Sequence, residues 1–290
     1  MREIFDKEKL KDLWVPDDER SKFDAGQVAI IGGSQLFHGA PILALRAASR
    51  IVDMVYFSGI EKDKEVADKI KAGLSSFIWV AREEVGEYIE KSDAVLIGPG
   101  LMRYEKEDSQ KGDRIDGEGR KTRELTKKLL EGYKDKRWVI DGGSLQVMEP
   151  ELIPSGAVVT PNQKEFEMLF GERVDVKDEE EMVVKASKQA SRYECVVVLK
   201  GPTSVVTNGE KSYLIRGGSS GLAKGGTGDV LAGLIVGLMA RNESMLAASF
   251  ANWLIKRAGE RLENERGEMF NADDVADMVT VVWGEVKSSF

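Results

Sequence analysis

The sequence predicts an α/β protein with a mostly parallel central sheet and helices on both of its faces. Short apolar, β-branched runs alternate with longer stretches of helical periodicity, which is typical of βαβ units. The short runs are almost continuously apolar, as expected of strands that are buried on both faces. No stretch rich in Pro, Gly or Ser divides the chain, so we expect a single domain over residues 1–290.

Seven apolar segments and one hairpin are the expected strands. The segments are rich in valine and isoleucine and are bounded by turn-forming residues. They are 27–31, 52–57, 76–80, 93–97, 137–140, 157–159 and 195–199. Two further segments, 203–207 and 211–215, flank Asn208-Gly209, a dipeptide favoured in tight hairpin turns, so we expect them to pair antiparallel.

Helices are expected between these strands and at the end of the chain. The first has Pro41 in its first turn, where proline is favoured. The expected helices are 41–51, 64–72, 122–132, 163–170, 179–192, 229–240, 244–264 and 272–287. The charged segment 103–121 has almost nothing to bury and is predicted to be a loop insertion. Both a solvated loop and a closing lid are consistent with it.

Composition and charge narrow the classes of function. Apolar residues make up 42% of the chain and charged residues 32%, as in ordinary globular proteins, and the net charge of −8 argues against nucleic-acid binding. The single cysteine, Cys195, excludes an intrachain disulfide and a multi-cysteine metal site. The first residues lack a signal-peptide pattern, and the apolar run 230–240 is too short to span a bilayer. We therefore expect a cytoplasmic protein without a membrane partner.

Glycine or small polar residues follow five of the predicted strands. In a doubly wound sheet the loops beyond the carboxyl ends of the strands form the functional groove. These segments are Gly32-Gly33-Ser34, Gly98-Pro99-Gly100, Asp141-Gly142-Gly143, Thr160 to Glu165, and Lys200-Gly201-Pro202-Thr203. A structural turn could explain any one of them, but five in a row predict one extended groove.

The most informative of the glycine-rich segments is Gly225-Gly226-Thr227-Gly228-Asp229, which leads into an apolar helix. The first N–H groups of a helix lack intrahelical partners and carry partial positive charge, so this turn predicts an anion site. An aspartate weakens such a site, and proton abstraction from a hydroxyl that faces a phosphate is a reason for its presence. The alternative is that Asp229 only caps the helix.

The segment Asn162-x-x-Glu165 also has two interpretations, a metal site and a helix cap. An amide and a carboxylate at this spacing can hold Mg²⁺ through water beside phosphates. The same residues can also form a capping box, with Asn162 as the cap and Glu165 in the first turn of the helix. The chain contains neither a Walker A motif nor a GxGxxG fingerprint, so neither of those nucleotide sites is supported.

Taken together, these motifs resemble the ribokinase-like superfamily and, more narrowly, the ADP/ATP-dependent NAD(P)H-hydrate dehydratases. The resemblance covers about residues 25–260, with the motifs in family order. It is carried by Ile31 to Ser34 with Phe37 to Pro41, Ile97 to Leu101, Asp141 to Leu145, Thr160 to Phe166, Leu199 to Gly201, and Gly225 to Gly233. The resemblance implies a ribokinase-like fold and the repair of hydrated NADH or NADPH. It also implies the route of that repair, in which a phosphoryl group passes from ADP or ATP to the hydrate hydroxyl and phosphate is then eliminated.

The resemblance also implies roles for particular residues. Asp229 is the base on the hydroxyl and also contacts the substrate, while Gly226, Thr227 and Gly228 stabilise the transferring phosphoryl group. Glu165 helps to hold Mg²⁺ through water. The implied substrate-binding residues are Ala40, Gly100 and Asn162, and the implied nucleotide-binding residues are Lys200, Gly201, Pro202, Thr203, Ser204 and Gly228.

The chain departs from the family pattern at Asn162, where the family usually has a histidine that contacts the substrate. Asparagine at this position is typical of the sugar and vitamin kinases of the superfamily. A small-molecule kinase acting on a sugar or pyrimidine-type alcohol is therefore one alternative function, and a non-catalytic adenylate-binding protein is another. The sequence leaves open whether His38, the only histidine, replaces the imidazole that the family has at position 162. We expect a homo-oligomer, and a separate protein for any epimerase activity.

Overall fold

A ten-stranded sheet runs through the computed structural model, which describes residues 2–14, 19, 21–22, 24–59, 70, 73–103 and 117–287. The strand order is β1-β10-β9-β8-β7-β6-β5-β2-β3-β4. Neighbouring strands are parallel except for the pairs β8–β9 and β9–β10. The strands are β1 (Arg2–Ile4), β2 (Gln27–Ile31), β3 (Met54–Ser58), β4 (Ile78–Trp79), β5 (Ala94–Ile97), β6 (Arg137–Ile140), β7 (Val158–Val159), β8 (Val196–Leu199), β9 (Ser204–Thr207) and β10 (Ser212–Ile215). The predicted α/β class and the predicted hairpin are confirmed.

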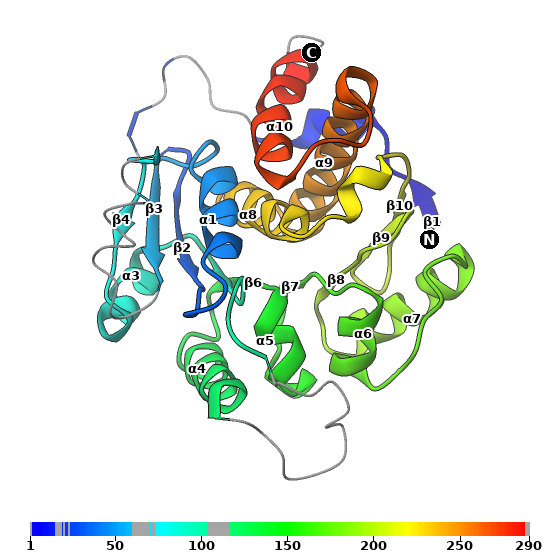
Figure 1. The fold of residues 1–290 in the computed structure, drawn as a ribbon. Coiled ribbons are helices and arrows are strands. Elements are labelled where there is room, and N and C mark those ends of the chain that lie inside the picture. The colour runs from blue at the N-terminus through cyan, green and yellow to red at the C-terminus, as the bar shows by residue number, and fades with distance from the viewer. Residues whose placement is uncertain are drawn as a thin grey trace.

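Helices cover both faces of this sheet (Figure 1). One layer consists of α1 (Gly39–Ala48), α8 (Thr227–Met239), α9 (Ser244–Arg266) and α10 (Ala272–Lys287). The other consists of α3 (Val85–Lys91), α4 (Gly117–Gly132), α5 (Gly142–Val147), α6 (Gln163–Phe170) and α7 (Glu179–Arg192). Short 3-10 helices are η1 (Lys7–Asp12), η2 (Arg82–Glu84), η3 (Pro150–Leu152) and η4 (Ser220–Ala223).

Two hydrophobic clusters separate the sheet from its helical layers. Val28 and Ile30 of β2 pack into the cluster beneath α1, α8, α9 and α10, whereas Ala29 and Ile31 point into the other cluster. This alternation is the period of two of a β-strand, and it buries both faces of the strand. It explains why the strand sequences are apolar throughout. Among the described residues, no helix is suited to span a lipid bilayer.

Several elements differ from the prediction. The strand expected at 52–57 lies at Met54–Ser58, and the strand expected at 76–80 is only Ile78–Trp79. Helix α4 begins at Gly117, so residues 117–121 of the expected loop are helical, while residues 104–116 lie outside the described residues. The expected helix 64–72 also lies outside them, except for residue 70.

Besides the short 3-10 helices, one strand and two α-helices were missed because they are too short or too irregular to show periodicity. β1 has three residues and acquires its strand structure by pairing in parallel with β10 at the sheet edge. Helix α3 has seven residues and α5 has six, and α5 begins with two glycines that are otherwise typical of a turn.

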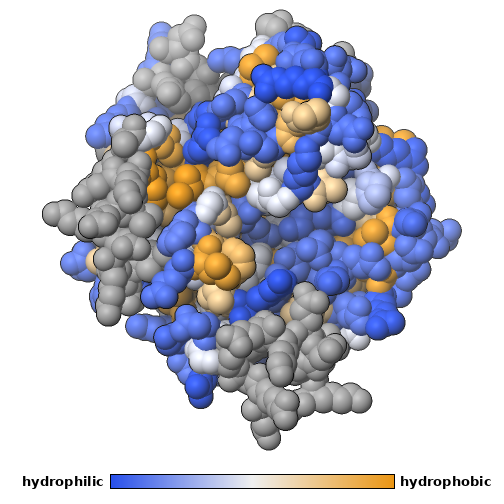
Figure 2. Space-filling view, viewed as in Figure 1, coloured by the Kyte–Doolittle hydropathy of each residue, from blue (hydrophilic) through white to orange (hydrophobic). Residues whose placement is uncertain are grey.

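Figure 2 shows hydrophilic residues over most of the face drawn in colour, with hydrophobic residues in separate smaller patches. Leu36 and Phe37, in the loop between β2 and α1, are among the exposed large apolar side chains, at 67% and 42% exposure. They lie next to the loops that follow the parallel strands, because the carbonyl of Phe37 closely approaches Gly100. An apolar surface is thus available beside the predicted groove.

Candidate active site

The loops after the parallel strands meet at one edge of the sheet, as predicted. The N–H of Gly33 donates to the carbonyl of Pro99 (2.8 Å), and the N–H of Lys200 donates to the carbonyl of Pro161 (2.9 Å). Because these strands are parallel, their carboxyl ends lie side by side and present the following residues together. The predicted site residues of four different loops are therefore neighbours in space.

Two of the strand-end glycines are required by the packing of these loops against one another. Gly98 has φ +120°, and a Cβ there would lie 1.7 Å from the carbonyl oxygen of Asp141. Gly100 has φ +70°, and a Cβ there would lie 2.5 Å from the carbonyl oxygen of Phe37. Only glycine fits either position. Gly100 is predicted to contact the substrate, but loop packing alone already requires a glycine there. Ala40, the other residue predicted to contact it, lies in the first turn of α1.

The N-terminus of α8 has the geometry expected of an anion site. Gly226 is the N-cap and has φ +97°, and the first intrahelical hydrogen bond runs from the N–H of Val230 to its carbonyl (3.1 Å). The N–H groups of Thr227 and Gly228 therefore have no partner within the helix. The Thr227 hydroxyl donates to the carbonyls of Leu222 (2.7 Å) and Lys224 (3.0 Å), which leaves its backbone N–H as the group for a phosphate.

Asp229 does not cap α8. It is the third residue of the helix, while the cap is Gly226 and makes no side-chain capping bond. Asp229 is therefore not the N-cap residue, although its carboxylate accepts a hydrogen bond from its own backbone N–H in the first turn. Burial, and next the charge of Asp141, raise the pKa of Asp229 to about 7, against the lowering effect of Lys200. A carboxyl group with this pKa can accept or release a proton near neutral pH.

Lys200 is the cation at the centre of the site. Its Nζ lies 3.1 Å from Oδ1 of Asp141 and 3.5 Å from Oε2 of Glu165. Burial lowers the pKa of Lys200, but the surrounding carboxylates outweigh it, so the net pKa is raised and the ammonium stays charged. A Cβ added at Gly228 would lie 3.4 Å from the same Nζ. The ammonium thus faces the first turn of α8.

Asn162 and Glu165 form a capping box at the start of α6. The Asn162 Oδ1 accepts from the N–H of Glu165 (3.0 Å), and Oε2 of Glu165 accepts from the N–H of Asn162 (2.8 Å). Oε1 of Glu165 also accepts from Nε2 of Gln146 (3.1 Å). The capping prediction is confirmed, and the side-chain oxygen of Asn162 is committed to it.

These contacts decide how Mg²⁺ could be held. Glu165 is buried and already accepts two hydrogen bonds, and it lies beside the Lys200 ammonium. Within the described residues, no group of three or more His, Cys, Asp or Glu side chains has the arrangement of a metal site. A carboxylate has about four lone-pair positions, so contact through a metal-bound water fits, whereas a direct protein cage does not.

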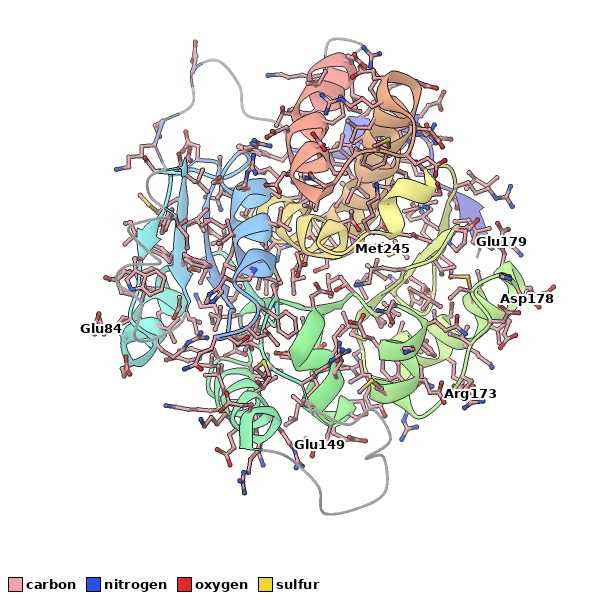
Figure 3. All side chains as sticks on the ribbon, viewed as in Figure 1. Glu84, Glu149, Arg173, Asp178, Glu179 and Met245 are labelled. Atoms are coloured by element: carbon pink, nitrogen blue, oxygen red, sulfur yellow. The ribbon has the colours of Figure 1, made fainter. Side chains whose placement is uncertain are left out.

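The loop 200–204 approaches the site from the end of β8. The Thr203 hydroxyl donates to Oε1 of Glu179 (2.8 Å), and Glu179 also accepts from Arg216 (2.7 Å). Figure 3 labels Glu179 at the start of α7. Ser204 is buried as the first residue of β9. The side chain of Thr203 is thus held by the protein and Ser204 is buried, while the Lys200 side chain reaches the carboxylates of Asp141 and Glu165.

Two residues of this region were not predicted as site residues. Asp141 accepts hydrogen bonds from the Thr160 hydroxyl (2.6 Å) and from Lys200, which brings a carboxylate into the site. The sequence indicates Asp141 as a site residue by its position directly after the apolar run 137–140, at the end of a predicted strand. Lys256, on α9, donates to carbonyls of the 200–204 loop. Its signal is a lysine within an apolar helical run.

A family model described as NAD(P)H-hydrate dehydratase matches residues 28–280. The chain belongs to this family. The predicted family and its ribokinase-like fold are therefore confirmed.

Two curated relatives from this dehydratase family differ in length. A bifunctional NAD(P)H-hydrate repair enzyme of Hyperthermus butylicus is 33% identical over 276 residues, which cover 89% of this chain and 48% of that protein. The chain thus spans about half the length of that relative. An ADP-dependent (S)-NAD(P)H-hydrate dehydratase of Nitrosopumilus maritimus is 31% identical over 278 residues, 90% of this chain and 89% of that protein.

The fold also matches solved structures. The ADP/ATP-dependent NAD(P)H-hydrate dehydratase of Bacillus subtilis, co-crystallised with ATP and Mg²⁺, superposes with a TM-score of 0.79 at 24% identity. The match covers 98% of both chains. At this identity the likeness establishes the shared fold.

Proposed function

We propose that this dehydratase-family chain catalyses the nucleotide-dependent dehydration of hydrated NADH or NADPH. The observation that carries the proposal is the carboxylate of Asp229, which has a pKa of about 7 and stands at the N-terminus of α8 without a capping role. A base and an anion site lie side by side there, as phosphoryl transfer to a hydroxyl requires. The names of the relatives supply the substrate.

In the first step, Asp229 accepts the proton of the hydrate hydroxyl. The hydroxyl oxygen then forms a bond to the terminal phosphorus of the nucleotide, and the bond from that phosphorus to the bridging oxygen breaks. AMP leaves if ADP is the donor, and ADP leaves if ATP is the donor. The N–H groups of Thr227 and Gly228 stabilise the charge on the phosphoryl oxygens, and Gly226 allows their approach.

In the second step, phosphate leaves with the electrons of the carbon–oxygen bond. The lone pair of the neighbouring ring nitrogen assists this departure, and the adjacent ring carbon loses a proton to solvent. The ring double bond is restored, and the net change is loss of water from the hydrate with hydrolysis of one phosphoanhydride. Phosphorylation is needed because hydroxide is a poor leaving group and phosphate is a good one.

The nucleotide is proposed to lie along Lys200, Gly201, Pro202, Thr203 and Ser204, with its terminal phosphate at Gly228. Both ADP and ATP remain candidate donors, because the relatives include an enzyme named ADP-dependent and one named ADP/ATP-dependent. Mg²⁺ bound to the phosphates would neutralise their charge, with Glu165 contacting it through water. Lys200 would add a fixed positive charge beside the transferring group.

The nicotinamide part of the substrate is proposed to lie against Ala40, Gly100 and the exposed Asn162. The Oδ1 of Asn162 is used in the capping box, so its amide nitrogen is the group available to a substrate. A separate protein acting as the epimerase, a homo-oligomeric assembly and a cytoplasmic location remain predictions. Light scattering of the purified protein tests the assembly.

The function is tested by adding NADH hydrate, Mg²⁺ and either ADP or ATP, and by following absorbance in the reduced-nicotinamide band. We expect NADH to be restored only when nucleotide is present, and the Asp229→Asn variant to restore it far more slowly than wild type. Nucleotide consumption only with added sugars or pyrimidine-type alcohols would identify a kinase instead. Nucleotide binding without turnover of any of these compounds would favour the non-catalytic alternative.

A further inference from the structure

Lys256 is a buried lysine that the proposed chemistry does not use. It lies on α9, the residue is 6% exposed, and its ammonium donates to three backbone carbonyls. The acceptors are Pro202 (2.7 Å), Gly217 (3.2 Å) and Gly201 (3.4 Å). Burial lowers the pKa of Lys256 to about 8, with Glu260 opposing this and Arg257 adding to it. At neutral pH the ammonium is therefore charged, with an acceptor for each of its protons.

The three carbonyls belong to two loops on either side of the antiparallel strand β9. Gly201 and Pro202 directly follow Lys200 at the end of β8, whereas Gly217 follows β10. Lys256 therefore joins the loop proposed to bind the nucleotide to the segment that leads toward α8. Carbonyl dipoles of two loops would point at one another without a cation between them.

The same face of α9 continues this connection. Glu260, one turn after Lys256, accepts from the N–H of Gly218 (3.0 Å). Gly259 allows close packing of Leu222, because a Cβ there would lie 2.6 Å from Leu222 Cδ1. The carbonyl of Leu222 in turn accepts from the Thr227 hydroxyl in the first turn of α8.

We propose that Lys256 is a positioning residue that fixes the distance between the 200–204 loop and the N-terminal turn of α8, and thereby sets the affinity for the phosphoryl donor. The proposal rests on the proposed function, because it places a nucleoside di- or triphosphate between these two walls. Lys256 touches only carbonyls of the protein and acts through the two loops. None of its hydrogen bonds reaches Ala40, Gly100 or Asn162, the residues proposed to contact the nicotinamide.

This geometry predicts that a change at Lys256 alters the KM for the nucleotide and not the KM for the hydrate. Replacing Lys256 by methionine keeps a flexible side chain of similar length but removes the charge and all three hydrogen bonds. We expect the nucleotide KM to rise by about tenfold, equivalent to about 1.4 kcal/mol, while the KM for the hydrate stays unchanged. A lysine that only stabilises the fold would lower the melting temperature and leave both KM values as they are.

The experiment compares wild type, Lys256→Met and Lys128→Met, which removes a lysine from the exposed side of α4. Nucleotide affinity is measured by calorimetry with ADP and with ATP, and both KM values are measured in the NADH-hydrate assay. Weaker nucleotide binding in Lys256→Met alone supports the proposal. Unchanged nucleotide affinity, or an equal rise in both KM values, overturns it. If the wild-type protein binds nucleotide but repairs no hydrate, the proposed function is refuted. The calorimetric comparison then still tests whether Lys256 sets the nucleotide affinity.

A measurement on wild type covers the case in which Lys256→Met does not fold. Amide hydrogen exchange is followed for residues 201–204 and 217–222 with and without ADP. Because one ammonium ties these segments together, nucleotide binding should slow exchange in both. Slower exchange in 201–204 alone would show that the second segment is not coupled to the nucleotide and would overturn the proposal.

Discussion

Two carboxylates occupy the same helical position at this site and behave differently. Glu165 is the third residue of α6, and Asp229 is the third residue of α8. Glu165 is held by the backbone of its own cap and by Gln146. Asp229 has a glycine as its cap, and burial raises its pKa to about 7.

The difference shows how the N-cap decides the use of the carboxylate three residues later. An asparagine cap draws the carboxylate back onto the helix end, so one oxygen of each side chain is used by the helix. A glycine cap offers no side chain, so the N–H groups of Thr227 and Gly228 are left for a ligand, beside a carboxylate that accepts from its own backbone N–H. Lys200 stands between the two helix ends, ion-paired with Glu165 and facing the first turn of α8.

The largest expected effect comes from Asp229→Asn. If Asp229 is the base, kcat falls by about 10² to 10⁴-fold. Because the folded pKa lies above the ordinary value of 3.8, ionisation of this group costs stability as the pH rises toward about 7. At pH 8 the variant should therefore be more stable than wild type, by about 1–3 kcal/mol. Activity assays and urea unfolding at pH 8 check both parts. A variant that is inactive and also less stable would contradict this assignment.

The pH dependence of the wild-type enzyme should show the same carboxyl group. Below its pKa of about 7, Asp229 is protonated and cannot accept the hydroxyl proton. We expect kcat/KM to fall by about tenfold per pH unit below that value. Nucleotide binding, measured by calorimetry over the same range, serves as the control for a general loss of the site. A rate that is flat down to pH 5 would exclude Asp229 as the base.

Glu165→Gln separates the charge of Glu165 from its capping role. Glutamine also caps from this position, so the melting temperature should change little. If Glu165 holds Mg²⁺ through water, the Mg²⁺ concentration for half-maximal rate should rise by about three- to tenfold. The charge of Glu165 also raises the pKa of Asp229, so the acid limb of the rate profile should move to lower pH. An unchanged Mg²⁺ requirement would leave Glu165 a structural residue.

The smallest effect is expected for Asn162→Ala. The loss of the cap should reduce the free energy of unfolding by about 1 kcal/mol. Asn162→Ser, which retains a capping oxygen, should restore most of it in urea titrations. If the serine variant regains stability but binds the hydrate more weakly than wild type, the amide of Asn162 also contacts the substrate.

The main elements of the fold follow from local sequence. The apolar runs of β2, β5 and β8 identify buried parallel strands, because only strands covered on both faces are apolar throughout. Their parallel order brings the following loops together, so the groove edge could be predicted from the strands alone. β1 and α5 could not, because three- and six-residue elements carry no periodicity and depend on β10 and on the loops beside them.

The sequence by itself determined the family, the glycine-rich turn before α8 and the candidate base. Tertiary structure alone decided which polar residues are already used by the protein. The Thr227 hydroxyl, Asn162 Oδ1 and the Thr203 hydroxyl are all satisfied internally, which motif spacing does not show. It also brought Asp141 and Lys256 to the site from distant parts of the chain. The physical reason is that hydrogen bonding and burial depend on neighbours in space, whereas a motif records only neighbours in sequence.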